Sequence, residues 1–260
     1  MNDPLSVKYR KFQILDSAIV AITWRSILSL IITWGEKRES RYICICNVHS
    51  VVTAKRQPEL QKVINNADLA TPDGMPLVWM MRRSGSPSQQ RINGPDLMWK
   101  YCEVAEKNNQ SLYLFGSTES TLELLALKLR DAYPQLRIAG TYAPPFRPIT
   151  EDEDRETIDR INNSGAGVVF VGLGCPKQEL WMASHRGKVK AVMIGVGAAF
   201  DYHAGTVKRA PKWMQHSGLE WFYRLASEPK RLWKRYLTTN SLFVYYLLAS
   251  MFNRWNIKKV

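Results

Sequence analysis

Long hydrophobic runs are missing from this 260-residue chain, although 45% of its residues are hydrophobic. No window reaches the roughly 18–20 unbroken apolar residues that a membrane-spanning helix needs. The apolar stretch over residues 18–32 contains Arg25 and lacks a small-residue cleavage site, so we expect no signal peptide. The hydrophobic content is enough for one large core, or for one core with an appendage.

Cysteine and histidine are also scarce, with four of each. The cysteines are Cys44, Cys46, Cys102 and Cys175, and the histidines are His49, His185, His203 and His216. No pair has the C-x-x-C or Cys/His spacing of a zinc site. We therefore expect reduced, mostly buried thiols in a cytoplasmic protein. We interpret the histidines, including His49 near a strand end, as structural.

Acidic residues are outnumbered, with 23 Asp and Glu against 36 Lys and Arg, which gives a formal charge of +13. A charge of this size indicates a polyanionic partner or an anionic membrane surface. Nucleic acid is one such partner, but the known nucleic-acid-binding motifs are absent from the sequence. Nine tryptophans and eleven tyrosines, mixed with basic residues, favour a membrane interface.

Basic and aromatic residues both concentrate after residue 207. The basic ones include Lys208, Arg209, Lys212, Arg224, Lys230, Arg231, Lys234 and Arg235, and the aromatic ones include Trp213, Trp221, Phe222, Tyr223, Trp233 and Tyr236. We expect residues 208–260 to form a basic helical appendage that lies on an anionic membrane. The alternative is a helical hairpin packed on the core with a solvated basic face.

Strand-like and helix-like segments alternate through residues 1–207, which we expect to form the core. Short apolar runs predict strands over residues 12–15, 41–46, 68–71, 111–115, 136–139, 168–171 and 191–194. Helical periodicity predicts helices over residues 18–34, 58–66, 76–83, 95–108, 118–133 and 151–162, with another after Pro176. This alternation predicts an α/β fold with a Rossmann-like, mostly parallel sheet and flanking helices.

Polar residues and glycines gather where the predicted strands end. The residues at these ends are Asn47, Asp73, Gly116, Gly172 and Gly195. Ligands of such sheets bind beyond the C-terminal ends of the strands, so we expect one shared site. At one corner, Gly172 and Gly174 turn the chain toward Pro176, which we place at the first helical position. A helix N-terminus there would bind anions such as phosphate; the alternative is an ordinary strand-to-helix corner.

Asp73 stands in a Pro-Asp-Gly sequence. Such a sequence is either a common turn or a carboxylate presented as a general base, and the local sequence favours the turn. Neither Gly172-x-Gly174 nor Gly195-x-Gly197 completes a G-x-G-x-x-G fingerprint, and the sequence has no P-loop. An enzyme that uses a nicotinamide cofactor or ATP is therefore unsupported.

The acidic run Asp152-Glu153-Asp154 resembles the Asp-x-Asp pair with which many sugar transferases hold a divalent ion. Thr150 followed by Glu153 fits a capping box, and acidic residues in a first helical turn are favoured by the helix dipole. We therefore interpret this run as a helix start and expect no metal site in it.

Several blocks of residues together resemble the WecG/TagA/CpsF family of bacterial glycosyltransferases. In the first half of the chain they are Cys46-Asn47-Val48-His49, Thr71-Pro72-Asp73-Gly74, Arg91-Ile92-Asn93-Gly94-Pro95-Asp96 and Leu114-Phe115-Gly116-Ser117. In the second half they are Val171-Gly172-Leu173-Gly174-Cys175-Pro176-Lys177-Gln178-Glu179, Gly195-Val196-Gly197, Phe200-Asp201, Ala204-Gly205, Arg209-Ala210-Pro211, Leu219-Glu220-Trp221, Tyr223-Arg224-Leu225 and Glu228-Pro229. The resemblance implies a Rossmann-like variant without a metal-binding Asp-x-Asp.

The resemblance also implies an activity, which is the transfer of a hexose from a UDP-sugar with inversion. The acceptor would be a polyprenyl-diphosphate-linked sugar in exopolysaccharide or other cell-surface polysaccharide synthesis. The protein would lie peripherally at the cytoplasmic face of the inner membrane. It would use no metal or other cofactor and bind no nucleic acid. The oligomeric state is left open, with a homo-oligomer as one option.

One departure from the family bears on the donor. Many members have threonine two residues before the asparagine that matches Asn47, and here that residue is Ile45. The missing hydroxyl argues against an N-acetylmannosamine-type donor, and the Cys-Asn-Val-His block resembles the xanthan-type glucosyltransferases. We therefore expect UDP-glucose, with UDP-N-acetylmannosamine or its uronate as the alternative. A nucleic-acid-binding protein and a non-catalytic membrane scaffold are the alternatives of another class.

The resemblance also implies roles for the residues of this chain that match the family's motifs. Asp73 would be the general base that deprotonates the acceptor hydroxyl. The residues implied for substrate binding are Asn47 and Gln178 for the donor sugar or acceptor, Arg91 at the same pocket, Arg224, Arg231 and Lys234 for a diphosphate, and Gly116 and Asp201 for the nucleotide. Without a metal, such cations and helix termini would stabilise the charge of the departing UDP.

Overall fold

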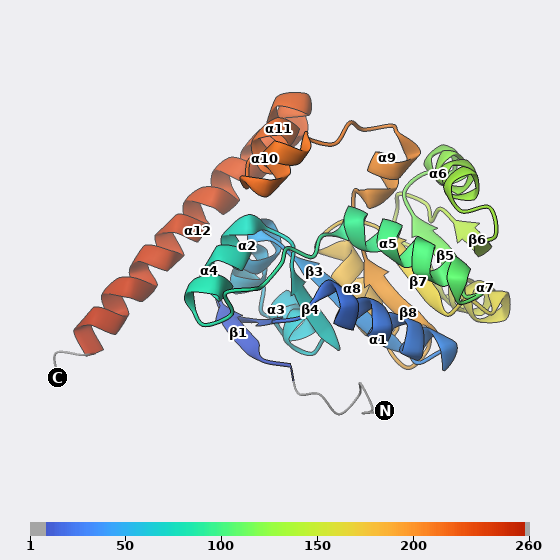
Figure 1. The fold of residues 1–260 in the computed structure, drawn as a ribbon, viewed down its shortest axis with the longest axis horizontal. Coiled ribbons are helices and arrows are strands. Elements are labelled where there is room, and N and C mark those ends of the chain that lie inside the picture. Colours follow the sequence, from blue (N-terminus) through green and yellow to red (C-terminus); the bar gives the residue numbers. More distant parts are fainter. Residues whose placement is uncertain (1–8, 258–260) are drawn as a thin grey trace.

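The computed structural model describes residues 9–257 (Figure 1). The first eight residues of the predicted core (1–8) and the last three of the predicted appendage (258–260) lie outside the described residues. A six-stranded sheet has the order β4-β3-β8-β7-β5-β6, and every pairing in it is parallel. Its strands are β3 (Arg41–Cys46), β4 (Leu69–Pro72), β5 (Ser111–Gly116), β6 (Arg137–Tyr142), β7 (Val168–Gly172) and β8 (Val192–Gly195). The predicted α/β fold is confirmed.

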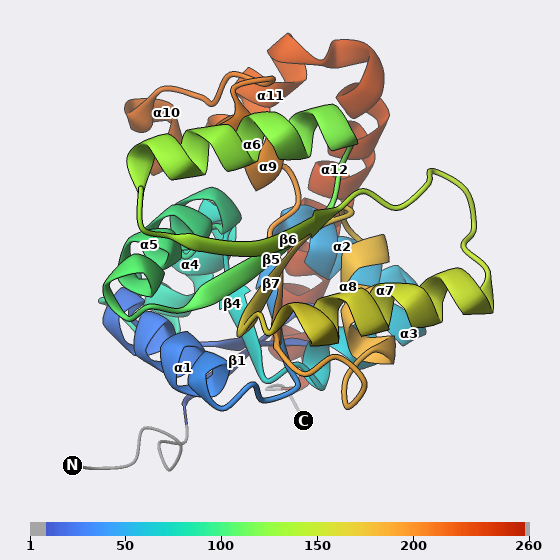
Figure 2. The same cartoon turned by 90° about the vertical axis from the view of Figure 1, so that its right-hand side faces the viewer.

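The sheet is buried on both faces, as the continuous apolar runs of its central strands require. One face packs against α1 (Trp24–Glu36), α5 (Gly94–Lys107), α6 (Glu119–Ala132) and α9 (Ala199–Ala204). The other face packs against α2 (Val48–Arg56), α3 (Pro58–Asn65), α4 (Met75–Arg83), α7 (Glu151–Ser164) and α8 (Lys177–Ser184). Figure 2 views the sheet from its β6 edge, with α1 and α5 on one side and α3, α7 and α8 on the other.

The N-terminal segment differs from its prediction. Residues 17–20 are a strand, not the start of a helix, because β1 (Lys11–Ile14) and β2 (Ser17–Val20) form an antiparallel hairpin. Leu15 and Asp16 between them have φ angles of 47° and 66°, the positive values that a tight two-residue hairpin turn needs. Helix α1 starts only after Thr23, whose side chain accepts the Ser26 N–H as an N-cap.

Three further elements differ from their predictions. Helix α2 was not predicted; it begins at a capping box in which Asn47 and Ser50 bond each other's backbone N–H groups. Pro176 was predicted at the first helical position of α8 but stands at its N-cap, because the helix begins one residue later, at Lys177. Strand β6 continues to Tyr142 instead of ending at residue 139.

The C-terminal region is helical, as predicted. It contains α10 (Lys212–His216), α11 (Glu220–Ser227) and α12 (Pro229–Ile257). Helix α12 packs along α2 and buries Leu232 and Phe243, while its C-terminal part projects away from the sheet (Figure 1). None of the helices in residues 9–257 combines the length with the apolar character that crossing a bilayer requires. The division of the chain at residue 207 stays a prediction.

Candidate active site

A cleft of about 750 Å³ opens beyond the C-terminal ends of the strands, and α10, α11 and α12 form its opposite wall. Four of the five predicted strand-end residues line this cleft: Asn47, Asp73, Gly172 and Gly195. The fifth, Gly116, is not among the described residues that line it, although its neighbour Ser117 is. Gly116 has a φ of 119°, and a Cβ there would lie 2.7 Å from the Gly172 backbone. A glycine at position 116 therefore allows the backbones of β5 and β7 to approach closely.

Asp73 lies just after β4, where its backbone N–H donates to the Cys46 carbonyl at 2.7 Å. Its carboxylate oxygen Oδ1 accepts hydrogen bonds from Arg91, at 2.9 Å from Nη2 and 3.2 Å from Nε. Desolvation by burial raises the pKa of the Asp73 carboxyl, Arg91 and Asn47 lower it, and Glu220 adds to the rise. The side chain keeps 19% of its surface exposed, so it reaches the cleft as a carboxylate more basic than usual. That combination suits a general base.

Arg91 lies in the loop before α5 and joins Asp73 to the appendage. Its Nη2 also donates to Glu220 Oε2 at 2.6 Å, and its Nη1 donates to the Gln215 carbonyl at 3.5 Å. Glu220 stands at the start of α11 and also lies 3.5 Å from Arg209. No role for Glu220 was predicted; the Leu-Glu-Trp block that contains it was its only signal in the sequence.

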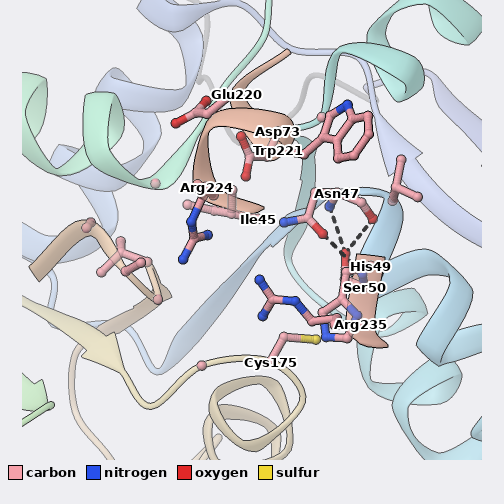
Figure 3. A pocket seen from close by; sticks show the side chains of 18 of the residues that line it. Ile45, Asn47, His49, Ser50, Asp73, Cys175, Glu220, Trp221, Arg224 and Arg235 are labelled. Carbon is pink, nitrogen blue, oxygen red and sulfur yellow. Dashed lines mark hydrogen bonds between the residues drawn. The ribbon is translucent and has the colours of Figure 1, made fainter. Parts of the chain in front are cut away.

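Asn47 has a structural task as well as a place in the cleft. Its Oδ1 accepts the Ser50 N–H at 3.2 Å and thereby caps α2. A hydrogen bond from the Asn47 side chain lowers the pKa of Asp73, so the amide also faces the proposed base (Figure 3). The predicted contact between Asn47 and a sugar stays a prediction.

Gln178 is buried and joins two glycine corners. Its Oε1 accepts the Gly174 N–H at 3.2 Å and the Gly197 N–H at 3.1 Å, and its Nε2 donates to Glu179 Oε1 at 2.9 Å. These three bonds occupy most of the bonding capacity of the amide. Gln178 lines the cleft, and its predicted contact with a sugar or acceptor stays a prediction.

Beneath the Gln178 corner lies a buried carboxyl beside two thiols. Glu179 is 1% exposed, and burial raises its pKa, although hydrogen bonds from Gln178 and Cys175 act in the opposite direction. Burial is also the main reason that the pKa values of Cys46 and Cys175 are raised. The described cysteines are all free thiols, three of them buried, as the sequence predicted.

The appendage supplies cations to the cleft. Arg224 of α11 and Arg235 of α12 extend toward its interior in Figure 3. Arg231 lines the cleft too, but its side chain is 60% exposed and pairs with Glu228 at 2.6 Å. Lys234 is not among the described residues that line the cleft; its Nζ lies 5.5 Å from the centre of the Trp233 ring.

Arg235 is a cation of the cleft to which the sequence assigned no role in substrate binding. It follows Arg231 by four residues, so both lie on one face of α12, and this spacing was the available signal. Arg235 also faces His49, whose pKa falls to about 4 because of burial first and the nearby Arg235 second. His49 is therefore neutral near pH 7.

Asp201 of α9 lines the cleft on the side of the appendage. Burial raises the pKa of its carboxyl, and Arg231 and Arg224 lower it. The predicted nucleotide contact of Asp201 stays a prediction.

The acidic run at residues 152–154 begins α7, as predicted. Thr150 accepts the Glu153 N–H at 3.3 Å, and Glu153 accepts the Thr150 N–H at 2.8 Å, so the capping box is confirmed. Glu153 also pairs with Arg147, and Asp154 with His185. Within residues 9–257, no three His, Cys, Asp or Glu side chains form a group that could hold a metal ion.

Comparison with known proteins identifies the family of this chain. The chain matches the model of the Glycosyl transferase WecG/TagA/CpsF family over residues 12–257. It is 31% identical to a protein of Bacillus spizizenii over 207 residues, which cover 79% of this chain and 78% of that protein. It is 36% identical to a protein of Bacillus subtilis over 178 residues, 68% of this chain and 67% of that protein. Both relatives carry the name N-acetylglucosaminyldiphosphoundecaprenol N-acetyl-beta-D-mannosaminyltransferase. This chain therefore belongs to the WecG/TagA/CpsF family and is a glycosyltransferase.

Proposed function

We propose that the protein transfers N-acetylmannosamine from its UDP-activated form to N-acetylglucosamine that is linked through a diphosphate to a polyprenyl lipid. The names of the two Bacillus relatives support this donor and this acceptor. They favour the alternative that the sequence left open over UDP-glucose. Ile45, at the position where many family members have threonine, lines the cleft. Its apolar side chain suits contact with the methyl of the acetamido group on the donor sugar.

The observation that carries the proposal is the Asp73 carboxylate, which reaches the cleft with a raised pKa. Asp73 takes the proton of the acceptor hydroxyl while that oxygen bonds to the anomeric carbon of the donor. The bond between the anomeric carbon and the β-phosphate oxygen of UDP breaks in the same displacement, which inverts the configuration at that carbon.

The cations of the appendage stabilise the leaving group. Arg224 and Arg235 extend into the same cleft as Asp73, and Arg231 lies at its exposed side. Guanidinium groups form charge-assisted hydrogen bonds with phosphate oxygens, so they neutralise charge that develops on UDP. In this proposal they take the place of a divalent metal.

The appendage also brings the cleft to a lipid substrate. Large apolar side chains are exposed on α10, α11 and α12, including Trp213, Phe222, Trp233, Leu237, Val244, Tyr245 and Leu248. Lys and Arg residues stand among them as far as Arg235, and residues 236–253 contain neither. Exposed aromatics beside basic residues favour the interface of an anionic membrane. We place the protein peripherally at the cytoplasmic face of the inner membrane, where UDP-sugars and lipid-linked acceptors meet.

A donor panel tests the proposal. The purified protein is incubated with UDP-N-acetylmannosamine, UDP-N-acetylglucosamine or UDP-glucose and a short-chain lipid diphosphate that carries N-acetylglucosamine. We expect transfer of N-acetylmannosamine, undiminished by EDTA. A higher kcat/KM with UDP-glucose would overturn the donor, and activity that EDTA abolishes and manganese restores would overturn the metal-free account.

Asp73→Asn tests the base. We expect kcat to fall by at least about 100-fold, because general bases contribute at that level. The matched control is Asp131→Asn, which changes an exposed aspartate at the end of α6. Turnover by Asp73→Asn at the level of the control would remove Asp73 from its proposed role.

A further inference from the structure

One guanidinium is shared by two carboxylates in the wall of the cleft. Arg91 Nη2 lies 2.9 Å from Asp73 Oδ1 and 2.6 Å from Glu220 Oε2. The three side chains are 14–19% exposed, so solvent screens their charges only in part. Asp73 and Glu220 lie near each other in Figure 3, although they come from opposite sides of the cleft and stand 147 positions apart in the sequence.

Glu220 is itself fixed by a second pair. Its Oε1 lies 3.5 Å from Arg209 Nε, while Arg209 Nη1 lies 2.5 Å from Asp96 Oδ1. Arg209 Nη2 also donates to Asn93 Oδ1 at 3.0 Å. The start of α11 is therefore tied to the first turn of α5, on the same stretch of chain that carries Arg91.

The sharing of Arg91 has a chemical consequence. A cation paired with a single carboxylate stabilises its charged form and makes it a weaker base. A second carboxylate on the same cation offsets part of that effect. In agreement, Arg91 lowers the pKa of Asp73, and Glu220 raises it.

We propose that Glu220 is a positioning residue that limits how strongly Arg91 holds the Asp73 carboxylate. Because Glu220 belongs to α11, the packing of the appendage on the core then sets the strength of the base as well as supplying cations to the leaving group. The inference rests on the proposed role of Asp73 as the general base.

Other titratable groups surround Asp73, Arg91 and Glu220. Those that line the cleft are His49 of α2, Asp201 of α9, Arg224 of α11, and Arg231 and Arg235 of α12. Cys46 of β3 interacts electrostatically with Asp73, and Asp96 of α5 with Arg91. His49, with a pKa of about 4, and Cys46, with a raised pKa, keep their neutral forms near pH 7. The arginines keep their charge.

The test is the pH profile of kcat/KM for the full-length protein and for Glu220→Gln, with the substrates of the donor panel. Glutamine can still accept the Arg91 hydrogen bond but removes the negative charge. We expect the acidic limb of the profile to move to lower pH by about one pH unit, since neighbouring charges shift a carboxylate by that order. On the plateau we expect kcat to fall about threefold, because Asp73 becomes a weaker base. An acidic limb that stays in place or moves to higher pH would overturn the inference.

Controls separate this from structural effects and from the proposed function. Glu103→Gln changes an exposed glutamate of α5 and should leave the profile unchanged. Glu220→Asp keeps the charge but withdraws it from Arg91, so we expect a smaller displacement in the same direction, and this variant decides the question if Glu220→Gln does not fold. Asp73→Asn is measured in parallel. If Asp73→Asn abolishes turnover while the Glu220 variants keep the acidic limb of the wild-type pH profile, the inference about Glu220 fails and Asp73 keeps its role as the general base.

Discussion

The side-chain oxygen of Gln178 accepts the backbone N–H of Gly197 at 3.1 Å, which joins the loop after β8 to the start of α8. The same oxygen accepts the Gly174 N–H at 3.2 Å. Gly174 and Gly197 have φ angles of 77° and 55°, which favour glycine. One amide thus fixes the two glycine corners that form the floor of the cleft.

Gln178→Ala should therefore destabilise the fold as well as impair transfer. Two backbone N–H groups would lose their acceptor, and unsatisfied buried donors cost about 1–3 kcal/mol each. We expect the free energy of unfolding to fall by about 2 kcal/mol or more, measured by urea denaturation. Gln135→Ala, which changes an exposed glutamine, is the control. Equal stability of the two variants would contradict the bridging role.

Glu179→Gln should stabilise the protein at high pH. The pKa of the buried Glu179 is raised above its unfolded value, so its contribution to stability is full below the unfolded pKa and is lost as pH rises through the folded pKa. A glutamine does not ionise, and its oxygen can still accept the Gln178 bond. We expect equal stability of variant and wild type near about pH 4 and a more stable variant near about pH 8, by urea denaturation. Glu123→Gln, on the exposed face of α6, should show no such difference.

Arg235→Ala should impair transfer more than Lys234→Ala, although the two residues are adjacent. Arg235 lines the cleft and Lys234 lies against Trp233. Loss of one charge-assisted bond to a phosphate corresponds to about a 10- to 100-fold fall in kcat/KM. The assay uses a water-soluble acceptor analogue, so that membrane binding does not enter, and exposed Lys230→Ala serves as the control. A larger effect at Lys234 would contradict this prediction and support the diphosphate contact that the sequence assigned to Lys234.

Replacing Trp213, Phe222 and Leu237 together by serine should weaken membrane binding. These side chains are 64%, 54% and 64% exposed, one on each appendage helix. We expect binding to vesicles with anionic lipid to fall at least about tenfold, given the apolar area that is lost. Leu127→Ser on α6, where leucine is 61% exposed, is the matched control. Flotation of the triple variant with vesicles at wild-type levels would contradict the proposed surface.

Much of the fold was predictable because its signals are local. The apolar run of β7, all buried from Val168 to Val171, has the composition of a central parallel strand. The capping box of Thr150 and Glu153 predicted the start of α7. The hairpin of β1 and β2 was missed because residues 17–20 have apolar spacing that also fits a helix, and the turn at Leu15 and Asp16 lacks the usual glycine or asparagine.

The sequence by itself determined the alternation of strands and helices, the family, and the strand-end positions of Asn47 and Asp73, since each depends on local pattern or on contiguous motifs. The tertiary structure decided which distant groups meet. It placed Arg235 in the cleft and Lys234 outside it, and it brought Glu220 to Arg91. Those outcomes depend on how α11 and α12 pack against the core, and on the orientation of each helix face, because side chains that are neighbours in the sequence point in different directions on a helix.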